Sequence, residues 1–286
     1  MNDSSLFLKN LKKNLIKVGI KKKDSVYLGV NLGQAFKFYK STIFQDRSLE
    51  KVREKCSKLI FHAISEQLGS DGTIICPTFT FDFIKKRVFD VHKTKSHLGY
   101  FENFFLKQKN VIRSEHPIFS IAVWGKNKKI LKPCGTFSFG ANSPFSNFID
   151  YKVKFLNIGV KWVETCTYLH HLEHLNGINH RFYKPTKGKI INKDKSKIDI
   201  FYNPIRFVRL KSDKAEYRIE KHLKKKFLIK EAKDKIYCSS LKTKDVHDLG
   251  LKILQKKPSY FMSKDVNIYI DSKDKLTIKE SKHKFI

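Results

Sequence analysis

Hydrophobic residues recur at helical spacing in two segments near the start of the chain. The leucines of residues 4–18 predict a helix that ends at Gly19. A longer amphipathic pattern predicts a second helix over residues 49–68, ending at Gly69. Short apolar runs between and after these helices predict four buried strands, at residues 25–30, 73–76, 119–124 and 155–160.

The pattern changes after Lys184. Alternating residues predict two strands around a turn-rich stretch, then two helices and a terminal hairpin. The ranges are 187–191 and 197–202 for the strands, 213–226 and 245–256 for the helices, and 266–270 with 276–278 for the hairpin. The predicted fold class is therefore α/β, with a central, largely parallel or mixed sheet flanked by helices and a more antiparallel C-terminal part.

The domain organisation follows from the same pattern. No internal repeat or low-complexity linker interrupts the chain. We therefore expect a single domain over residues 1–286, with an active-site core at 1–184 and a C-terminal subregion at 185–286.

Composition indicates a globular protein in a reducing compartment. Hydrophobic residues make up 41% of the 286 residues and include 24 Phe. We find no apolar run of membrane-spanning length and no signal-peptide core, so a cytoplasmic location without membrane contact is expected. The five cysteines are scattered without a Cys-x-x-Cys pair, which argues against disulfides and thiolate zinc sites.

The formal charge of +32 suggests an anionic partner. Only eight of the 59 basic residues are Arg, however, and the lysines are spread over the whole sequence. Arg is the better side chain for bidentate contacts to phosphates and bases. We therefore expect no dedicated nucleic-acid partner, although the charge raises the local concentration of anionic ligands.

The densest group of chemically active residues follows the predicted strand at 155–160. His170, His171, Glu173 and His174 lie within five positions, and helical spacing puts all but His171 on one face. One interpretation makes His170 a general base that Glu173 orients, because an ordinary histidine titrates near neutrality. A second is zinc binding through the pattern His-x-x-Glu-His, and a third is a purely structural role.

Three loops carry further candidate residues. Arg113, Ser114 and His116 precede a predicted strand and suit a phosphate-bearing ligand, although a polar turn fixed by Pro117 would look the same. The turn-rich loop at 139–144 and the segment at 77–80, where a buried strand ends, could also contact a ligand. None of these loop sequences identifies a ligand or an activity on its own.

Taken in order, these segments resemble the aminoglycoside N3-acetyltransferase family, acetyl-CoA-dependent enzymes outside the GNAT class. The resemblance is strongest over about residues 50–185 and rests on five ordered motifs. They are Gly-Thr-Ile-Ile-Cys-Pro-Thr-Phe-Thr from 72, Ser-His-Leu-Gly-Tyr-Phe-Glu from 96, Arg-Ser-Glu-His-Pro from 113, Phe-Gly-Ala-Asn-Ser-Pro from 139, and Thr-Tyr-Leu-His-His-Leu-Glu from 167.

The resemblance implies that His170 is the catalytic base and Glu173 its partner, with direct acetyl transfer from acetyl-CoA to an amine. It implies no metal, which makes the zinc pattern a coincidence. A small-molecule amine and acetyl-CoA are the expected partners, and a homodimer is compatible with the sequence. The implied coenzyme-binding residues are Pro77, Thr78, Thr80, Arg113, Ser114, His116, Asn142, Ser143 and Thr167.

One departure from the family bears on the acceptor. Members commonly carry His-x-Ser-Leu after the first strand, whereas this chain has Gly-Val-Asn-Leu from Gly29 to Leu32. The acceptor is expected to be an amino sugar or aminoglycoside-like amine. The excess of basic residues favours an anionic or neutral molecule, such as a nucleotide-linked amino sugar, over a polycation. A zinc-dependent hydrolase and a polyanion-binding or nucleic-acid-binding module are the alternatives.

Overall fold

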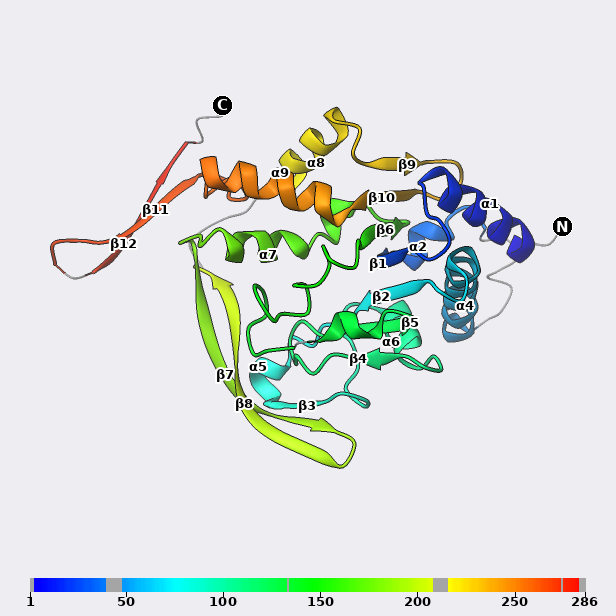
Figure 1. Cartoon of the computed structure of the whole chain (residues 1–286), viewed down its shortest axis with the longest axis horizontal. Helices are drawn as coiled ribbons and strands as arrows, with labels where there is room; N and C mark the ends of the chain where they lie inside the picture. Colours follow the sequence, from blue (N-terminus) through cyan, green and yellow to red (C-terminus); the bar gives the residue numbers. More distant parts are fainter. Residues whose placement is uncertain (1–2, 40–47, 133, 208–215, 274, 283–286) are drawn as a thin grey trace.

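A seven-stranded sheet forms the centre of the protein (Figure 1). The computed structural model describes residues 3–39, 48–132, 134–207, 216–273 and 275–282. Across the sheet the strand order is β4-β5-β2-β1-β6-β10-β9. The strands are β1 (Ser25–Val30), β2 (Thr73–Pro77), β4 (Ile112–Arg113), β5 (Ile121–Gly125), β6 (Lys154–Ile158), β9 (Lys230–Ala232) and β10 (Cys238–Lys242).

The middle of this sheet is parallel and its flanks are antiparallel. Strand β1 pairs in parallel with β2 and β6, whereas β5, β4, β10 and β9 continue the sheet with antiparallel pairs. The prediction of an α/β fold with a largely parallel or mixed sheet is confirmed in its mixed form. Because β1, β2 and β6 run in one direction, their carboxyl ends meet at one edge, where ligand sites commonly lie.

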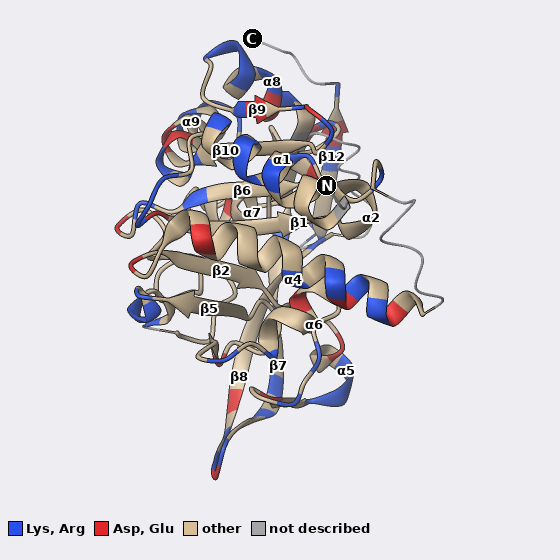
Figure 2. Ribbon diagram, turned by 90° about the vertical axis from the view of Figure 1, so that its right-hand side faces the viewer, with Lys and Arg blue, Asp and Glu red and all other residues tan. Residues whose placement is uncertain are grey.

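Helices cover both faces of the sheet. Figure 2 shows α1 (Asp3–Lys17), α4 (Leu49–Leu68) and α6 (Tyr100–Leu106) in front of the strands. On the opposite face pack α7 (Tyr168–Leu175), α8 (Glu216–Lys225) and α9 (Thr243–Lys256). Strand β1 shows how the sequence makes two cores, because Val26 and Leu28 join the first helix layer and Tyr27 the second.

The two N-terminal helices end where their sequences predict. Helix α4 begins after Ser48, whose hydroxyl accepts a hydrogen bond from the Lys51 amide at 3.4 Å. It ends at Gly69, and α1 is followed by Gly19; both glycines have positive φ angles, of 71° and 78°. A residue with a side chain would be strained at either position, so both helix ends are encoded locally.

A second, three-stranded sheet lies beside the first. It contains β3 (Val88–Asp90) and the long antiparallel hairpin of β7 (Arg181–Asn192) and β8 (Lys195–Arg206). Both predicted strands of this hairpin are confirmed, but each is longer than its apolar pattern indicates. One face of the hairpin buries Ile190 and Phe201 against Phe83 of α5 (Phe83–Lys86) and against Phe89.

The C-terminal part is more antiparallel, as predicted. Strands β11 (Asp265–Ile270) and β12 (Leu276–Ser281) form the expected terminal hairpin. Helix α8 falls within the predicted range 213–226, of which residues 213–215 lie outside the described part. Strands β9 and β10 were not predicted, because the sequence Cys-Ser-Ser-Leu-Lys of β10 carries no strong apolar signal. None of the helices in the described ranges has the length and apolar character needed to cross a bilayer.

Candidate active site

The candidate site is built on α7, which follows β6 through the short 3₁₀ helix η2 (Trp162–Glu164). Apolar side chains of α7 pack into the second core and fix the rotation of the helix. Its other side faces a small hollow of about 100 Å³, at the start of β7. The lining residues are His170, Glu173, His174, Gly177, Ile178, Arg181, Tyr183 and Pro204.

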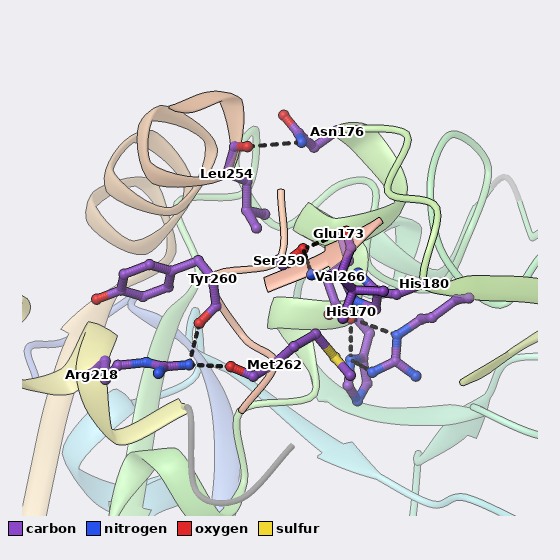
Figure 3. Close-up of polar contacts among 11 residues, drawn as sticks. His170, Glu173, Asn176, His180, Arg218, Leu254, Ser259, Tyr260, Met262 and Val266 are labelled. Carbon is purple, nitrogen blue, oxygen red and sulfur yellow. Dashed lines mark hydrogen bonds and ion pairs between the residues drawn. The ribbon is translucent and has the colours of Figure 1, made fainter. Parts of the chain in front are cut away.

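Glu173 is the centre of a buried polar network (Figure 3). Its Oε2 atom lies 2.7 Å from His170 Nδ1 and accepts a hydrogen bond from Arg181 Nε at 2.8 Å. Its Oε1 atom lies 3.0 Å from His180 Nε2. The side chain of Glu173 is only 1% exposed, so three partners hold one buried carboxylate in place.

This network keeps Glu173 charged and leaves one nitrogen of His170 free. Burial alone would raise the pKa of Glu173, but hydrogen bonds from His170 and His180 and the charge of Arg181 hold it well below its usual range. His170 Nδ1 lies between the Glu173 carboxylate and Nη2 of Arg181, which is 3.2 Å away, and we assign the ring proton to Nδ1 because the contact to Glu173 is the shorter one. Among the described residues nothing bonds to His170 Nε2, and the side chain is 35% exposed. His170 Nε2 is therefore not used by the described part of the protein.

His180 and Arg181 were not predicted as site residues. They follow Glu173 by seven and eight positions, beyond the reach of helical spacing. The turn at Gly177, with a φ of 62°, returns the chain so that both side chains point back at α7. The sequence signal was a pair of basic residues three and four positions after Gly177, the glycine that follows α7.

His171 points away from the hollow and holds the loop at 139–143. Its Nδ1 accepts a hydrogen bond from the Gly140 amide at 3.1 Å. Burial, with smaller contributions from His247 and His174, lowers the pKa of His171 to about 3, so the ring is a neutral acceptor at physiological pH. Gly140 has a φ of 90°, and a Cβ there would lie 2.0 Å from His174 Nε2. The loop thus requires glycine where it passes α7.

Two predicted coenzyme residues lie in this loop. Ser143 is buried, and its hydroxyl accepts a hydrogen bond from the Phe145 amide at 3.3 Å. Asn142 is exposed, with a left-handed φ of 59°, and its carbonyl accepts from the Gly135 amide at 2.6 Å. Of the two side chains, that of Asn142 faces solvent.

Arg113 is buried and its donors are used within the protein. Its Nε donates to the hydroxyls of Thr78 and Ser120 at 3.1 Å, and Nη1 donates to the Thr94 carbonyl at 2.6 Å. The guanidinium also lies 4.7 Å from the ring centre of Phe89, and burial lowers its pKa to about 10. Arg113 and Thr78 are therefore brought together, but as part of the scaffold at the end of β2.

The other predicted residues of this region are also buried. Thr80 donates its hydroxyl proton to the Pro117 carbonyl, and Pro77 ends β2. The Ser114 hydroxyl accepts from the Ile121 amide at 3.0 Å. His116 is fully buried; burial lowers its pKa to about 3, and its Nδ1 accepts from the Phe119 amide at 3.1 Å. These side chains shape the loop at 113–120 from inside.

A row of aromatic rings connects this loop to α7. The rings of Phe119 and Phe139 have centres 4.8 Å apart, and Phe139 lies 5.8 Å from the ring of His170. Thr167, the remaining predicted coenzyme residue, is half-buried directly before α7. The structure therefore brings the predicted loops at 113–120 and 139–143 up to the His170 side of the helix.

The segment that departs from the family pattern, Gly29–Leu32, has no room for a side chain at its first position. A Cβ at Gly29 would lie 2.6 Å from Asn157 Oδ1 and 2.7 Å from Thr165 Cγ2. These two side chains are hydrogen-bonded to each other at 2.7 Å. The family's histidine at this position would therefore not fit without a rearrangement of Asn157 and Thr165.

The same segment lines a separate cavity that contains a carboxyl group. This cavity of about 590 Å³ lies between Val30–Gly33, α4 and the start of α6, and Glu102 lines it. Burial raises the pKa of Glu102 to about 7, and among the described residues no other side chain pairs with its carboxyl. Sequence reasoning did not single out this residue.

The described ranges contain no group of three His, Cys, Asp or Glu side chains arranged to hold a metal ion. The zinc interpretation would need His170 and His174 as joint ligands. In the structure His170 Nδ1 faces Glu173, while His174 Nδ1 is bonded to the Tyr183 hydroxyl. The two rings thus serve different polar partners.

Solved structures of similar fold include several acetyltransferases. AAC-IIIb in its binary complex with CoASH matches with a TM-score of 0.71 and 15% identity, over 87% of this chain and 96% of that one. A mutant of AAC(3)-IVa in complex with apramycin gives 0.66 and 19%, over 88% and 93%. YokD from Bacillus subtilis gives 0.68 and 16%, over 87% and 98%. No curated protein matches the sequence.

The sequence itself matches one family along most of its length. The family described as aminoglycoside 3-N-acetyltransferase aligns with residues 47–255. This confirms the resemblance seen in the five motifs and extends it through α9, well past residue 185 where the motifs end. The chain therefore belongs to the aminoglycoside 3-N-acetyltransferase family.

Proposed function

We propose that this protein moves the acetyl group of acetyl-CoA directly to a primary amine of an amino sugar or aminoglycoside-like acceptor, with His170 as general base. One observation carries the proposal: a buried, charged Glu173 binds Nδ1 of His170 and leaves Nε2 free beside a hollow. Family membership supports acetyl transfer, and the bound CoASH of AAC-IIIb supports the coenzyme.

The chemistry requires a base because an alkylammonium is mostly protonated near pH 7. The ammonium first releases one proton to solvent; the lone pair of the neutral amine then attacks the thioester carbonyl, and His170 Nε2 takes the second proton from the nitrogen. The tetrahedral intermediate then collapses, the carbon–sulfur bond breaks, and the imidazolium returns the proton to the leaving thiolate. Glu173 stabilises the imidazolium during this cycle and does not itself need to change protonation.

The coenzyme would lie along the segments that follow β2 and β6 and along the loops at 113–120 and 139–143. Asn142 and Thr167 have accessible side chains and are proposed to contact acetyl-CoA directly. The buried side chains among the predicted coenzyme residues are proposed to shape the channel from behind, since their polar atoms already bond within the protein. These are Pro77, Thr78, Thr80, Arg113, Ser114, His116 and Ser143.

The hollow favours a neutral or anionic acceptor over a polycation. Among the described residues Glu173 is the one acidic side chain that lines it, and both of its oxygens are bonded to His170, His180 or Arg181. A polycationic aminoglycoside would meet no free carboxylate from these lining residues, on a protein of formal charge +32. Nucleotide-linked amino sugars remain the proposed class.

The test is release of free thiol from acetyl-CoA in the presence of individual amines. We expect turnover with nucleotide-linked amino sugars to exceed turnover with kanamycin-type compounds. Replacing His170→Ala should lower turnover about 10²–10⁴-fold, the usual contribution of a positioned base. Acetyl-CoA binding, measured by calorimetry, should stay near the wild-type value.

His62 provides a matched control, because it is an exposed histidine on α4. The variant His62→Ala should keep full turnover. Substantial activity in His170→Ala would overturn the base assignment. Thiol release that is selective for kanamycin-type compounds would overturn the acceptor class.

A further inference from the structure

Three aromatic side chains form an exposed platform at the base of the β7–β8 hairpin. The rings of Phe137 and Tyr202 are stacked, with centres 4.6 Å apart and planes 14° apart, and Tyr183 meets Phe137 edge-on at 5.3 Å. The backbone around Phe137 pairs with β8, since the Tyr202 amide donates to Thr136 and its carbonyl accepts from Ser138. The platform is thus rigid, yet Phe137 is 38% exposed.

This platform adjoins the hollow at His170. Tyr183 lines the hollow and also contacts Phe137. Its hydroxyl is hydrogen-bonded to Nδ1 of His174, whose ring lies 6.2 Å from that of Phe137. The hollow and the platform therefore share Tyr183 and adjoin each other.

Beyond the platform, the same face of the hairpin is basic and apolar. Antiparallel register places Lys187 opposite Ile200 and Lys189 opposite Ile198, on the side that carries Tyr202. All four side chains are exposed. No Asp or Glu occupies the positions of β7 or β8 that point to this side. Figure 2 shows blue Lys and Arg segments along this hairpin, with red segments on β8 and at its turn.

The opposite face of the hairpin explains why this one is unusual. There Ile190 and Phe201 are buried in a core, as expected for a sheet with one covered face. The outer face keeps stacked rings and lysines in solvent, beside the proposed base. Proteins bind nucleotides without base specificity by stacking the bases on aromatic rings and placing cationic side chains near the phosphates.

We propose that the hairpin face formed by Phe137, Tyr183, Tyr202, Lys187 and Lys189 binds the nucleotide part of the acceptor. The base would lie on the Phe137–Tyr202 stack, the phosphates would lie toward the lysines, and the amine would reach His170. Tyr183 and Lys187 are four residues apart, which is about 13 Å along a strand. The inference rests on the proposed function and names the chemistry of the acceptor: a planar base joined through phosphates to an amine-bearing sugar.

The first experiment measures binding without catalysis. Uridine diphosphate is titrated into the wild-type protein and into the variants Phe137→Ala and Lys187→Glu. We expect each variant to bind about tenfold more weakly, since stacking contributes about 1–3 kcal/mol per base and tenfold is about 1.4 kcal/mol. The matched controls are Phe227→Ala, which removes an aromatic ring that is 89% exposed elsewhere, and Lys252→Glu on the outside of α9; both should bind like wild type.

The second experiment separates the acceptor from the coenzyme, which also carries a nucleotide. At saturating acetyl-CoA, Phe137→Ala should raise KM for a nucleotide-linked amino sugar about tenfold while kcat stays within twofold. When acetyl-CoA is varied at saturating acceptor, its KM should also stay within twofold. The KM for glucosamine should not change. Equal weakening of acetyl-CoA would assign the face to the coenzyme and overturn the proposal, as would unaltered uridine diphosphate binding in both variants. Absence of thiol release with every amine would instead overturn the proposed function, because nucleotide binding is measured independently.

Discussion

Two buried glutamates on opposite sides of the central sheet have opposite electrostatic states. Glu173 lies on α7 and is 1% exposed, whereas Glu102 lies on α6 and is 7% exposed. Burial would raise the pKa of either carboxyl. Hydrogen bonds and cationic partners lower the pKa of Glu173 below its usual range, but Glu102 has no comparable partners among the described residues and its pKa rises to about 7.

Burial alone does not enable a carboxylate to orient a histidine that acts as a base. Glu173 stays charged because His170, His180 and Arg181 converge on its two oxygens, and this fixed charge orients His170. Glu102 faces a cavity of about 590 Å³ and is partly protonated near neutrality. A raised pKa in a cavity would ordinarily attract a functional assignment, and Glu102 also ends one of the five family motifs, yet the polar network with a histidine lies at Glu173.

The largest expected effect comes from removing the paired carboxylate. Glu173→Ala should lower the free energy of unfolding by about 3–5 kcal/mol, because it leaves His180 buried and Arg181 largely buried without their anionic partner. Urea denaturation at pH 7 measures this. A loss below about 1 kcal/mol would show that the network around Glu173 does not stabilise the folded protein.

A smaller loss is expected when only one partner of Glu173 is removed. His180→Leu takes the hydrogen bond from Oε1 while His170 and Arg181 remain on Oε2. One unsatisfied buried acceptor costs about 1–3 kcal/mol, so the unfolding free energy should fall by that amount at pH 7. Turnover should fall less than in His170→Ala, because the contact that orients the base is retained.

The loss of folding stability at low pH provides another test of the difference between Glu173 and Glu102. The pKa of Glu173 is lower in the folded than in the unfolded protein, so its contribution is fully present above the unfolded value of about 4.5 and is lost as pH falls below that value. Glu173→Gln should therefore flatten the loss of stability below pH 4.5. A wild-type acid limb in this variant would contradict the lowered pKa of Glu173.

The sequence pointed to His170 and Glu173 but not to the residues that contact them. His170 and Glu173 were predictable because helical spacing and an ordered motif mark them. His180 and Arg181 were not, because a turn rather than a periodic element returns them to α7. Arg113 was predicted as a ligand contact from its residue type, which does not reveal that its guanidinium is buried against Phe89.

The fold shows the same division. Helix ends at Gly19 and Gly69 follow from local backbone requirements and were predicted. Strand β10 depends on pairing with β6, a long-range contact without local signal, and was missed. The division of the chain at residue 184 remains a prediction, although β9 and β10 from the C-terminal part complete the central sheet. Tertiary contacts, and not residue patterns, therefore decide where β9 and β10 form and pair.

The expected effect of opposite sign comes from the carboxyl of Glu102, which has no side-chain partner among the described residues. The pKa of Glu102 rises from about 4.5 unfolded to about 7 folded, so the folded protein binds the extra proton and loses stability as pH rises from 4.5 to 7. Glu102→Gln removes the ionisation and should raise the unfolding free energy by about 3 kcal/mol at pH 8, with little change at pH 4. Thermal or urea unfolding at both pH values measures the difference. Equal effects at pH 4 and pH 8 would mean that Glu102 is paired when the protein is folded, and the contrast with Glu173 would then disappear.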